Sequence, residues 1–240
     1  MLKNVLKSTA RLLGFELRRF LPASSQAAQL RAMLLSHKVN LIFDVGANIG
    51  QYGMELRNHV GYRGRIVSFE PMRLAHKRLS KVAAKDRLWE VAKRTAIGEK
   101  QGAITINISS NSVSSSVLPM LVSHENAEPA SRYKDTELVP LNTLDMIVPC
   151  YTKVDSIIFL KIDTQGYESQ VLQGAMETLS RAIGVQLELS LIPLYAEQKL
   201  MLEMIEDMKA FGFSLWGIFP AFADSNTGRI LQIDATFFKD

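Results

Sequence analysis

Short apolar runs alternate with stretches of helical periodicity from about residue 40 to the end of the 240-residue chain. This alternation predicts strand–helix–strand units and a mostly parallel sheet. Apolar runs typical of buried strands span residues 41–45, 65–69, 89–95, 156–162 and 183–189. Two further runs, 213–218 and 231–238, are joined by a turn too short for a crossover helix, so we expect them to pair antiparallel.

The middle of the chain interrupts this alternation. Ile104, Ile106 and Ile108 alternate with polar residues, which predicts a half-exposed strand before a serine-rich loop at 109–116. Residues 117–133 contain two prolines and no clear periodicity, and we interpret them as a mobile lid. A short helix is expected over 141–147.

The N-terminus has a pattern of its own. Apolar residues recur at helical spacing with basic residues between them, which predicts an amphipathic helix over about residues 2–21 and a second helix over 26–36. Charges interrupt the apolar run, so it is neither a membrane span nor a signal peptide. Two interpretations stay open: the arm packs on its own domain, or it touches an anionic membrane peripherally. We divide the chain into a helical arm, residues 1–38, and a domain, residues 39–240.

The distribution of charge changes this picture more than the composition does. With 47% hydrophobic and 22% charged residues, the chain is typical of a globular protein. The net charge is +4, but residues 1–40 carry +6 and the remaining 200 residues about −2. A basic arm on a slightly acidic domain argues against a nucleic-acid partner. Cys150 is the single cysteine, which excludes an internal disulfide and leaves the cytoplasm as the expected compartment.

Acidic residues stand at or next to the ends of four predicted strands: Asp44, Glu70, Asp163 and Glu188. In an open α/β sheet, ligands bind outside these carboxyl ends. After Asp44 comes a glycine turn, Gly46-Ala47-Asn48-Ile49-Gly50, whose backbone can approach a ligand closely. The turn lacks the second glycine of the dinucleotide fingerprint, which weakens a pyrophosphate interpretation. Glu70 is placed to accept the ribose hydroxyls of either a nicotinamide cofactor or S-adenosylmethionine.

Several longer motifs follow one another in a specific order. They are FDVGANIGQYG (43–53), GRIVSFEP (64–71), AIGEKQG (96–102), the SSS cluster, LNTLD (141–145), FLKIDTQGYESQVLQGA (159–175) and QLELSLIPLY (186–195). In these motifs the chain resembles the FkbM-type S-adenosylmethionine-dependent methyltransferases, from about residue 40 to the end. One departure is Tyr167, where many members have a small residue, and it bears on the shape of the acceptor pocket.

The resemblance, together with the strand pattern, implies an α/β class I methyltransferase (Rossmann-like) fold. We expect a mostly parallel seven-stranded sheet with an antiparallel C-terminal strand and helices on both faces. The implied reaction is transfer of a methyl group from S-adenosyl-L-methionine to an oxygen atom. The implied acceptor is a small molecule or saccharide, most often a sugar hydroxyl in a glycan, glycolipid or glycosylated natural product.

Carried onto this chain, the resemblance places the methionine part of the cofactor at the glycine loop, the ribose at Glu70 and the adenine beside residues 95–97. The candidate cofactor-binding residues are Asp44, Gly46, Ala47, Asn48, Gly50, Glu70, Ala96, Ile97 and Asp163. The candidate acceptor-binding residues are Ser114, Ser115, Ser116 and Glu168.

A sugar hydroxyl needs a base or a metal when its oxygen is methylated. Asp163 is the first candidate base, and Glu188 and His124 are the second and third. The alternative for Asp163 is an N-cap of the helix that follows, and for Glu168 a favourable interaction with the dipole of that helix. Asp163 with Glu168 or Glu188 would also suit a hard divalent cation, although the sequence does not indicate one. Lys161 lies in a buried strand pattern and is expected to pair with an acid.

Two other functions compete with the methyltransferase. A nicotinamide-dependent oxidoreductase or epimerase would need a completed glycine fingerprint, and the sequence offers none. A non-catalytic member of the fold would keep the cofactor pocket and lose the acceptor site. Oligomeric state and acceptor identity are not fixed by the sequence.

Overall fold

The computed structural model describes residues 2–15, 17 and 19–240. Its main sheet contains β1 (Leu41–Val45), β2 (Arg65–Phe69), β3 (Trp89–Val91), β7 (Ile158–Ile162), β8 (Ala182–Ser190), β9 (Ser214–Ala223) and β10 (Ile230–Phe238). The strand order is β3-β2-β1-β7-β8-β10-β9. The first five strands in this order are parallel, and β10 is antiparallel to both β8 and β9. This is the predicted class I methyltransferase sheet.

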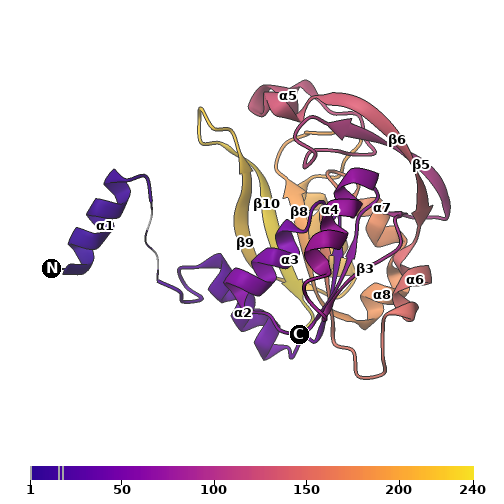
Figure 1. The fold of residues 1–240 in the computed structure, drawn as a ribbon, viewed down its shortest axis with the longest axis horizontal. Helices are drawn as coiled ribbons and strands as arrows, with labels where there is room; N and C mark the ends of the chain where they lie inside the picture. The colour runs from indigo at the N-terminus through magenta and orange to yellow at the C-terminus, as the bar shows by residue number, and fades with distance from the viewer. Residues whose placement is uncertain (1, 16, 18) are drawn as a thin grey trace.

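Helices cover both faces of the sheet (Figure 1). One face carries α2 (Gln26–Ser36), α3 (Gln51–Glu55) with the π-helical turn η1 (Leu56–Val60), and α4 (Arg73–Ala83); the other carries α7 (Glu168–Gln173), α8 (Met176–Arg181) and α9 (Met201–Ala210). Strand β1 shows why, because Phe43 packs in a cluster with α7–α9 and its neighbour Ile42 packs in the cluster with α2 and α4. A strand buried on both sides is expected to be almost continuously apolar, and β1 follows this pattern except at Asp44.

A second, three-stranded sheet lies beside the main one, in the order β4-β6-β5. Its strands are β4 (Ala96–Ile97), β5 (Gly102–Ser109) and β6 (Tyr133–Asn142), and β5 pairs antiparallel with β6. Between β5 and β6 the chain forms α5 (Val122–Ala127) and the 3-10 turn η2 (Pro129–Ser131). In Figure 1, α5, β5 and β6 gather at one end of the molecule. This end carries the segment that we interpret as a lid, whose mobility stays a prediction.

Three local predictions were wrong or incomplete. β6 was not predicted, and because it continues through Asn142, the helix expected over 141–147 begins only at Leu144, as α6 (Leu144–Ile147), followed by η3 (Val148–Cys150). The third strand ends at Val91, because the chain then leaves the main sheet to pair Ala96 with β6. In α4 the buried side is Ala75, Leu79 and Ala83, spaced four apart, and Leu74 is exposed.

The N-terminal helix α1 (Leu2–Leu12) is shorter than predicted and stands apart from the body in Figure 1. It ends at Gly14, whose φ of +79° allows the N–H of Phe15 to bond the carbonyl of Ala10 and its own N–H to bond that of Arg11. These are the two hydrogen bonds of a Schellman C-cap. Among the described residues, no helix has the length and apolarity needed to cross a bilayer.

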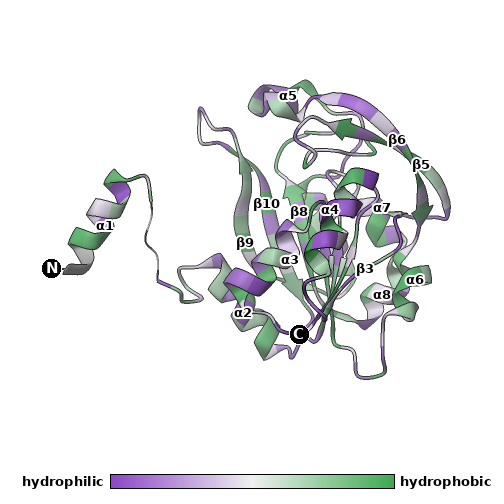
Figure 2. Cartoon of the chain, viewed as in Figure 1, coloured by the Kyte–Doolittle hydropathy of each residue, from purple (hydrophilic) through white to green (hydrophobic). Residues whose placement is uncertain are grey.

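The predicted second helix, α2, occupies its predicted span and is N-capped by Ser25. It packs into the same cluster as Ile42 through Leu30, Met33 and Leu34. The division of the chain at residue 38 stays a prediction, but in this structure α2 packs as part of the body. The segment that stands apart is the stretch before it, as the separated ribbon in Figure 2 also shows.

Candidate active site

A cavity of about 460 Å3 opens at the carboxyl ends of β1, β2 and β7. The main sheet supplies one wall, and the loop after β5 and α5 supply the other, through Ser112–Ser116 and His124. Its size is within the usual range for a small-molecule site. Of the candidate residues, those that line it are Gly46, Ala47, Asn48, Glu70, Ala96, Ile97, Ser114, Ser115, Ser116, His124, Asp163 and Glu188.

The glycine loop after β1 is held tightly against the neighbouring strand. Gly46 has φ +83°, and a Cβ atom there would lie 1.7 Å from the backbone oxygen of Asp163. The sequence predicted that a ligand approaches the backbone of this turn closely. At Gly46 the close neighbour is instead the backbone of Asp163. Gly50, with φ +99°, packs on Leu79 and Trp89 and does not line the cavity. Its role is to turn the chain into α3.

Glu70 fixes the loop from the next strand. Its Oε2 accepts the N–H of Asn48 at 2.8 Å and its Oε1 accepts the N–H of Met72 at 2.7 Å. Burial raises the pKa of Glu70 to about 8 although these two N–H groups oppose the shift. Each oxygen keeps a second lone pair, so the carboxyl group can still accept a hydroxyl from the cavity.

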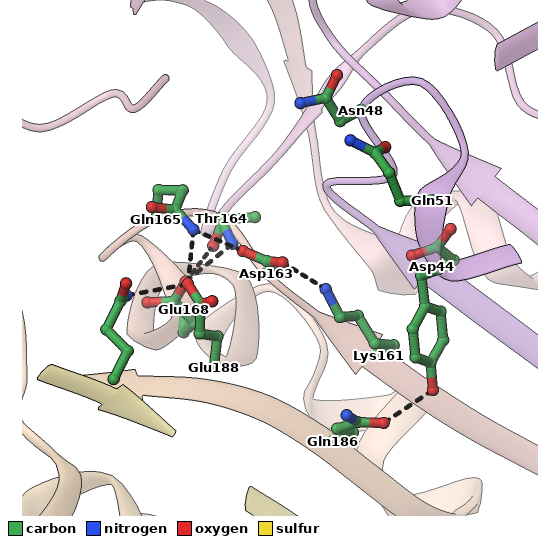
Figure 3. Close-up of polar contacts among 12 residues, drawn as sticks. Asp44, Asn48, Gln51, Lys161, Asp163, Thr164, Gln165, Glu168, Gln186 and Glu188 are labelled. Carbon is green, nitrogen blue, oxygen red and sulfur yellow. Dashed lines mark hydrogen bonds and ion pairs between the residues drawn. The ribbon is translucent and has the colours of Figure 1, made fainter. Parts of the chain in front are cut away.

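Figure 3 shows a buried ammonium group between carboxylates at the ends of β1 and β7. Lys161 Nζ lies 2.6 Å from Asp163 Oδ2, and register places Lys161 beside Asp44 on β1. Burial alone would lower the pKa of Lys161, but Asp163, Asp44 and Asp234 raise it above its ordinary value. The expected pairing of Lys161 with an acid is thus observed, and Lys161 is a fixed cation at neutral pH.

Asp44 does not line the cavity. Its Oδ2 accepts the hydroxyl of Ser68 at 2.9 Å, and its buried Oδ1 has no hydrogen-bond partner among the described residues. Burial raises the pKa of Asp44 to about 6, against the opposing charge of Lys161. From its place outside the cavity lining, the negative charge of Asp44 stabilises the ammonium group of Lys161.

Gln165 is the centre of a network that the sequence did not reveal (Figure 3). Its Nε2 donates to Asp163 Oδ1 at 2.9 Å and to Glu188 Oε2 at 2.5 Å. Its Oε1 accepts the hydroxyl of Tyr195 at 2.7 Å, and its φ of +55° is in the left-handed region. A non-glycine residue held in this conformation marks a constrained position, often at a functional site.

Glu188 is the second carboxyl of this network. Its Oε2 also accepts from Gln232 Nε2 at 2.9 Å. Burial, and then the neighbouring charge of Asp163, raise the pKa of Glu188 well above its ordinary value. Near neutral pH we therefore assign Glu188 as the protonated partner and Asp163, paired with Lys161, as the carboxylate.

An aromatic wall closes the far end of the cavity. His124 of α5 packs against Tyr195 with ring centroids 5.1 Å apart and against Phe222 at 5.3 Å. Burial lowers the pKa of His124 to about 4, so its imidazole is neutral at physiological pH. At this pKa the imidazole of His124 accepts a proton only weakly.

The serine loop mainly supports itself. Ser115 Oγ donates to the Ser112 carbonyl at 2.9 Å, and Ser116 Oγ donates to the Gln165 carbonyl at 2.6 Å. Since each hydroxyl has one proton, both can only accept hydrogen bonds from a ligand. Tyr167 also lines the cavity, but beside Gly98, with its hydroxyl bonded to Glu99 at 2.8 Å.

Glu168 lies outside the cavity lining. Its Oε1 accepts the N–H groups of Thr164 and Gly166 at 2.8 and 3.2 Å, and it holds the turn that carries Gln165. This corresponds to the structural alternative weighed for Glu168, and a contact with the acceptor stays a prediction. Among the described residues, no group of three or more His, Cys, Asp or Glu side chains is arranged to hold a metal.

The site fits S-adenosylmethionine on two observations. Asn48 Oδ1, on the cavity wall, is buried and has no partner among the described residues, so it offers an acceptor to an ammonium group. Ala96, Ile97, Met72 and Ile106 form an apolar wall next to Glu70, suited to a purine beside a ribose.

Comparison with known proteins decides the family. The family described as methyltransferase FkbM domain matches residues 44–215, well over half of the chain. The chain belongs to the FkbM methyltransferase family. A search of curated proteins returned no match. The sequence-based resemblance to a family of methyltransferases is therefore confirmed, and the oxidoreductase alternative is not supported.

Solved structures agree in fold. Methyltransferase FkbM from Methylobacillus flagellatus KT is 16% identical with a TM-score of 0.53, over 83% of this chain and 44% of that one. This FkbM chain thus spans less than half the length of that protein. Magnesium protoporphyrin IX methyltransferase from Synechocystis PCC 6803, with bound SAM, is 9% identical over 89% of this chain and 78% of that one, with a TM-score of 0.46. A putative rRNA-methylase from Clostridium thermocellum is 11% identical over 88% and 93%, with a TM-score of 0.42.

At such identities the likeness concerns the fold. The expectation that nucleic acid is not a partner of this FkbM chain stays a prediction.

Proposed function

We propose that this FkbM protein is an O-methyltransferase that methylates a sugar hydroxyl. The observation that supports this most strongly is the position of Asp163. It is a carboxylate at the cavity wall, partly exposed at 27%, beside the glycine loop on one side and the polar Gln165–Glu188–Gln232 group on the other. A hydroxyl acceptor needs a proton acceptor at that junction.

The chain's residues divide the cavity into two parts. Gly46, Ala47 and Asn48 would hold the methionine part of the cofactor, Glu70 the ribose, and Ala96 with Ile97 the adenine. When bound there, S-adenosylmethionine supplies an electrophilic methyl group. The other part, between Asp163, Glu188 and the aromatic wall of His124 and Phe222, would receive the acceptor.

The acceptor part combines features that suit a saccharide. Amide and carboxyl groups of Gln232 and Glu188 offer hydrogen bonds to hydroxyls, while the aromatic wall offers flat apolar surface to the C–H face of a ring. The serine-rich loop adds polar groups to the cavity lining through Asn111, Ser112, Ser114 and Ser115. No cationic side chain other than Lys161 lines the cavity among the described residues, which disfavours a phosphate-rich nucleic acid there.

The proton balance follows from this arrangement. The acceptor hydroxyl would give its proton to Asp163 while its oxygen forms the new bond to the methyl carbon, and the bond from that carbon to the sulfur of S-adenosylmethionine would break, with S-adenosylhomocysteine as the leaving group. Lys161 and Gln165 hold the two oxygens of Asp163, which orients the free lone pairs. The protonated carboxyl of Glu188 can donate to a second hydroxyl and so align the acceptor, a contribution from positioning.

The proposal is tested by methyl transfer from radiolabelled S-adenosylmethionine to three acceptor pools: polysaccharide, glycolipid and total RNA. The expected result is label in a saccharide pool, recovered as an alkali-stable sugar methyl ether. Label in RNA alone would contradict the proposal. Asp163→Asn protein serves as the control for transfer that does not need this site.

A further inference from the structure

The helix α1 exposes an apolar face that nothing in the described structure covers. Val5, Leu6, Leu12 and Leu13 are 57, 53, 88 and 69% exposed. Their spacing, with Leu6 and Leu13 seven apart and Val5 and Leu12 seven apart, places them on one side of the helix. Figure 2 shows α1 as a separate element with hydrophobic bands, away from the body.

The opposite side of α1 is basic. Lys7 and Arg11 have exposed side chains and lie four positions apart, so the two cations fall in one row along the helix. Residues 1–22 carry five basic residues and one acidic residue, a net charge of +4, whereas residues 41–240 carry about −2. The positive charge of this protein is thus concentrated on the arm.

The apolar surface continues beyond the helix. After the Schellman turn at Gly14, Phe15, Leu17 and Phe20 are 69, 49 and 53% exposed before the chain reaches α2. Large exposed apolar side chains gathered in one segment mark an interaction site more often than isolated ones do.

We infer that this arm binds the surface of an anionic membrane, with α1 lying in the plane of the interface. At 11 residues the helix is about 16 Å long, far short of the roughly 30 Å hydrocarbon core, so it cannot span. An interfacial helix requires an apolar face for the acyl chains and cations on the opposite face for lipid phosphates, which is the pattern of α1. A second copy of the chain, or another protein, would use the apolar face alone and leave the row of cations without a function.

The experiment is co-sedimentation of the full-length protein with vesicles. One set is phosphatidylcholine, and the other is phosphatidylcholine and phosphatidylglycerol in equal parts. We expect binding to the mixed vesicles only, weakened by added salt. Two arm variants, Leu6→Glu with Leu13→Glu and Lys7→Glu with Arg11→Glu, should each weaken binding at least about tenfold.

Matched variants on the body serve as controls. Leu202 of α9 is 69% exposed, so Leu202→Glu places a charge on an exposed leucine elsewhere. Lys77 and Lys81 are exposed and four apart on α4, so Lys77→Glu with Lys81→Glu repeats the charge reversal. Neither control should change sedimentation.

Three results would overturn the inference. The parent protein does not sediment with the mixed vesicles, or the arm variants sediment as the parent does, or the controls weaken binding as much as the arm variants. Size-exclusion chromatography of the same proteins tests the alternative that a second copy of the chain covers the apolar face. A parent protein that is a dimer and does not bind vesicles, together with arm variants that are monomers, would assign this face to the second copy. Since α1 stands apart from the body, thermal unfolding of both arm variants should match the parent.

Discussion

Replacing Gly46 by alanine should destabilise this FkbM protein far more than the same change at Gly212. Both glycines have nearly the same left-handed conformation, with φ +83° and +84°. The difference is in what a Cβ atom would meet: the backbone oxygen of Asp163 at 1.7 Å for Gly46, and nothing within 4 Å for Gly212. Gly212→Ala therefore measures conformational strain alone.

The magnitude can be worked out from these two environments. A left-handed conformation costs a non-glycine residue about 1–2 kcal/mol, which is the full cost expected at position 212. At position 46 the β1 loop and the end of β7 must also separate by more than an ångström, which stretches the hydrogen bond of 3.0 Å from Asp163 N to Val45 O. Overpacking adds about 1–3 kcal/mol and a lost hydrogen bond about 1 kcal/mol.

Urea unfolding of both variants checks this reasoning. We expect Gly46→Ala to lower the free energy of unfolding by about 2–4 kcal/mol more than Gly212→Ala, or roughly 4–16 °C in Tm for a chain of this size. The affinity for S-adenosylmethionine should fall only for Gly46→Ala. Equal losses of stability at the two sites would refute the close contact between β1 and β7.

Other consequences follow from the cavity. Because burial raises the pKa of Glu70 from 4.5 to about 8, the folded protein holds a proton there that the unfolded chain releases, so this group lowers stability as pH rises through that window. Glu70→Gln should flatten the fall in unfolding free energy between about pH 5 and pH 8, and parallel profiles of variant and parent would contradict this. Gln165→Met removes the N–H donors to Asp163 and Glu188, and leaving these groups unpaired costs about 1–3 kcal/mol. We therefore expect kcat to fall about tenfold or more, while the cofactor affinity measured by titration does not change. An unchanged kcat would exclude a positioning role for Gln165. Asp163→Asn should reduce methyl transfer to the saccharide acceptor at least about a hundredfold. The control, Asp234→Asn, also removes a carboxylate near Lys161, but Asp234 lies outside the cavity lining, so this variant should reduce transfer far less. Similar losses in the two variants would exclude Asp163 as the base.

Much of this fold could be predicted because its central strands are buried on both faces. β1 and β2 have the predicted bounds, since each is a short, mostly apolar run that carries an acidic residue at or next to its end and leads into a turn. β6 could not be predicted in the same way. It begins at Tyr133, continues with the polar Lys134, Asp135 and Thr136, carries Pro140, and becomes a strand because β5 and β4 pair with it. Pairing between distant segments is not encoded in local periodicity.

The candidate site shows the same limit. Glu70 and Asp163 were predicted because acidic residues at the carboxyl ends of buried strands lie where an open α/β sheet binds its ligands. Gln165 was not, because its importance comes from a left-handed backbone and a bond to Tyr195, thirty residues further along. Two of the quoted motifs contain Gln165 and Tyr195, so the sequence pointed to these residues through its resemblance to a family and not through a physical pattern.

The position of the cofactor is tested most directly by isothermal titration of the parent FkbM protein, Glu70→Ala and the control Glu90→Ala with S-adenosylmethionine, S-adenosylhomocysteine and NAD. Glu90 is an exposed acid on β3, away from the cavity lining. We expect micromolar binding of the first two ligands, no binding of NAD, a loss of at least about tenfold in Glu70→Ala, and parent-like binding in Glu90→Ala. Binding of S-adenosylmethionine with the same affinity in all three proteins would contradict the placement of its ribose at Glu70, and with it the division of the cavity on which the proposed reaction rests.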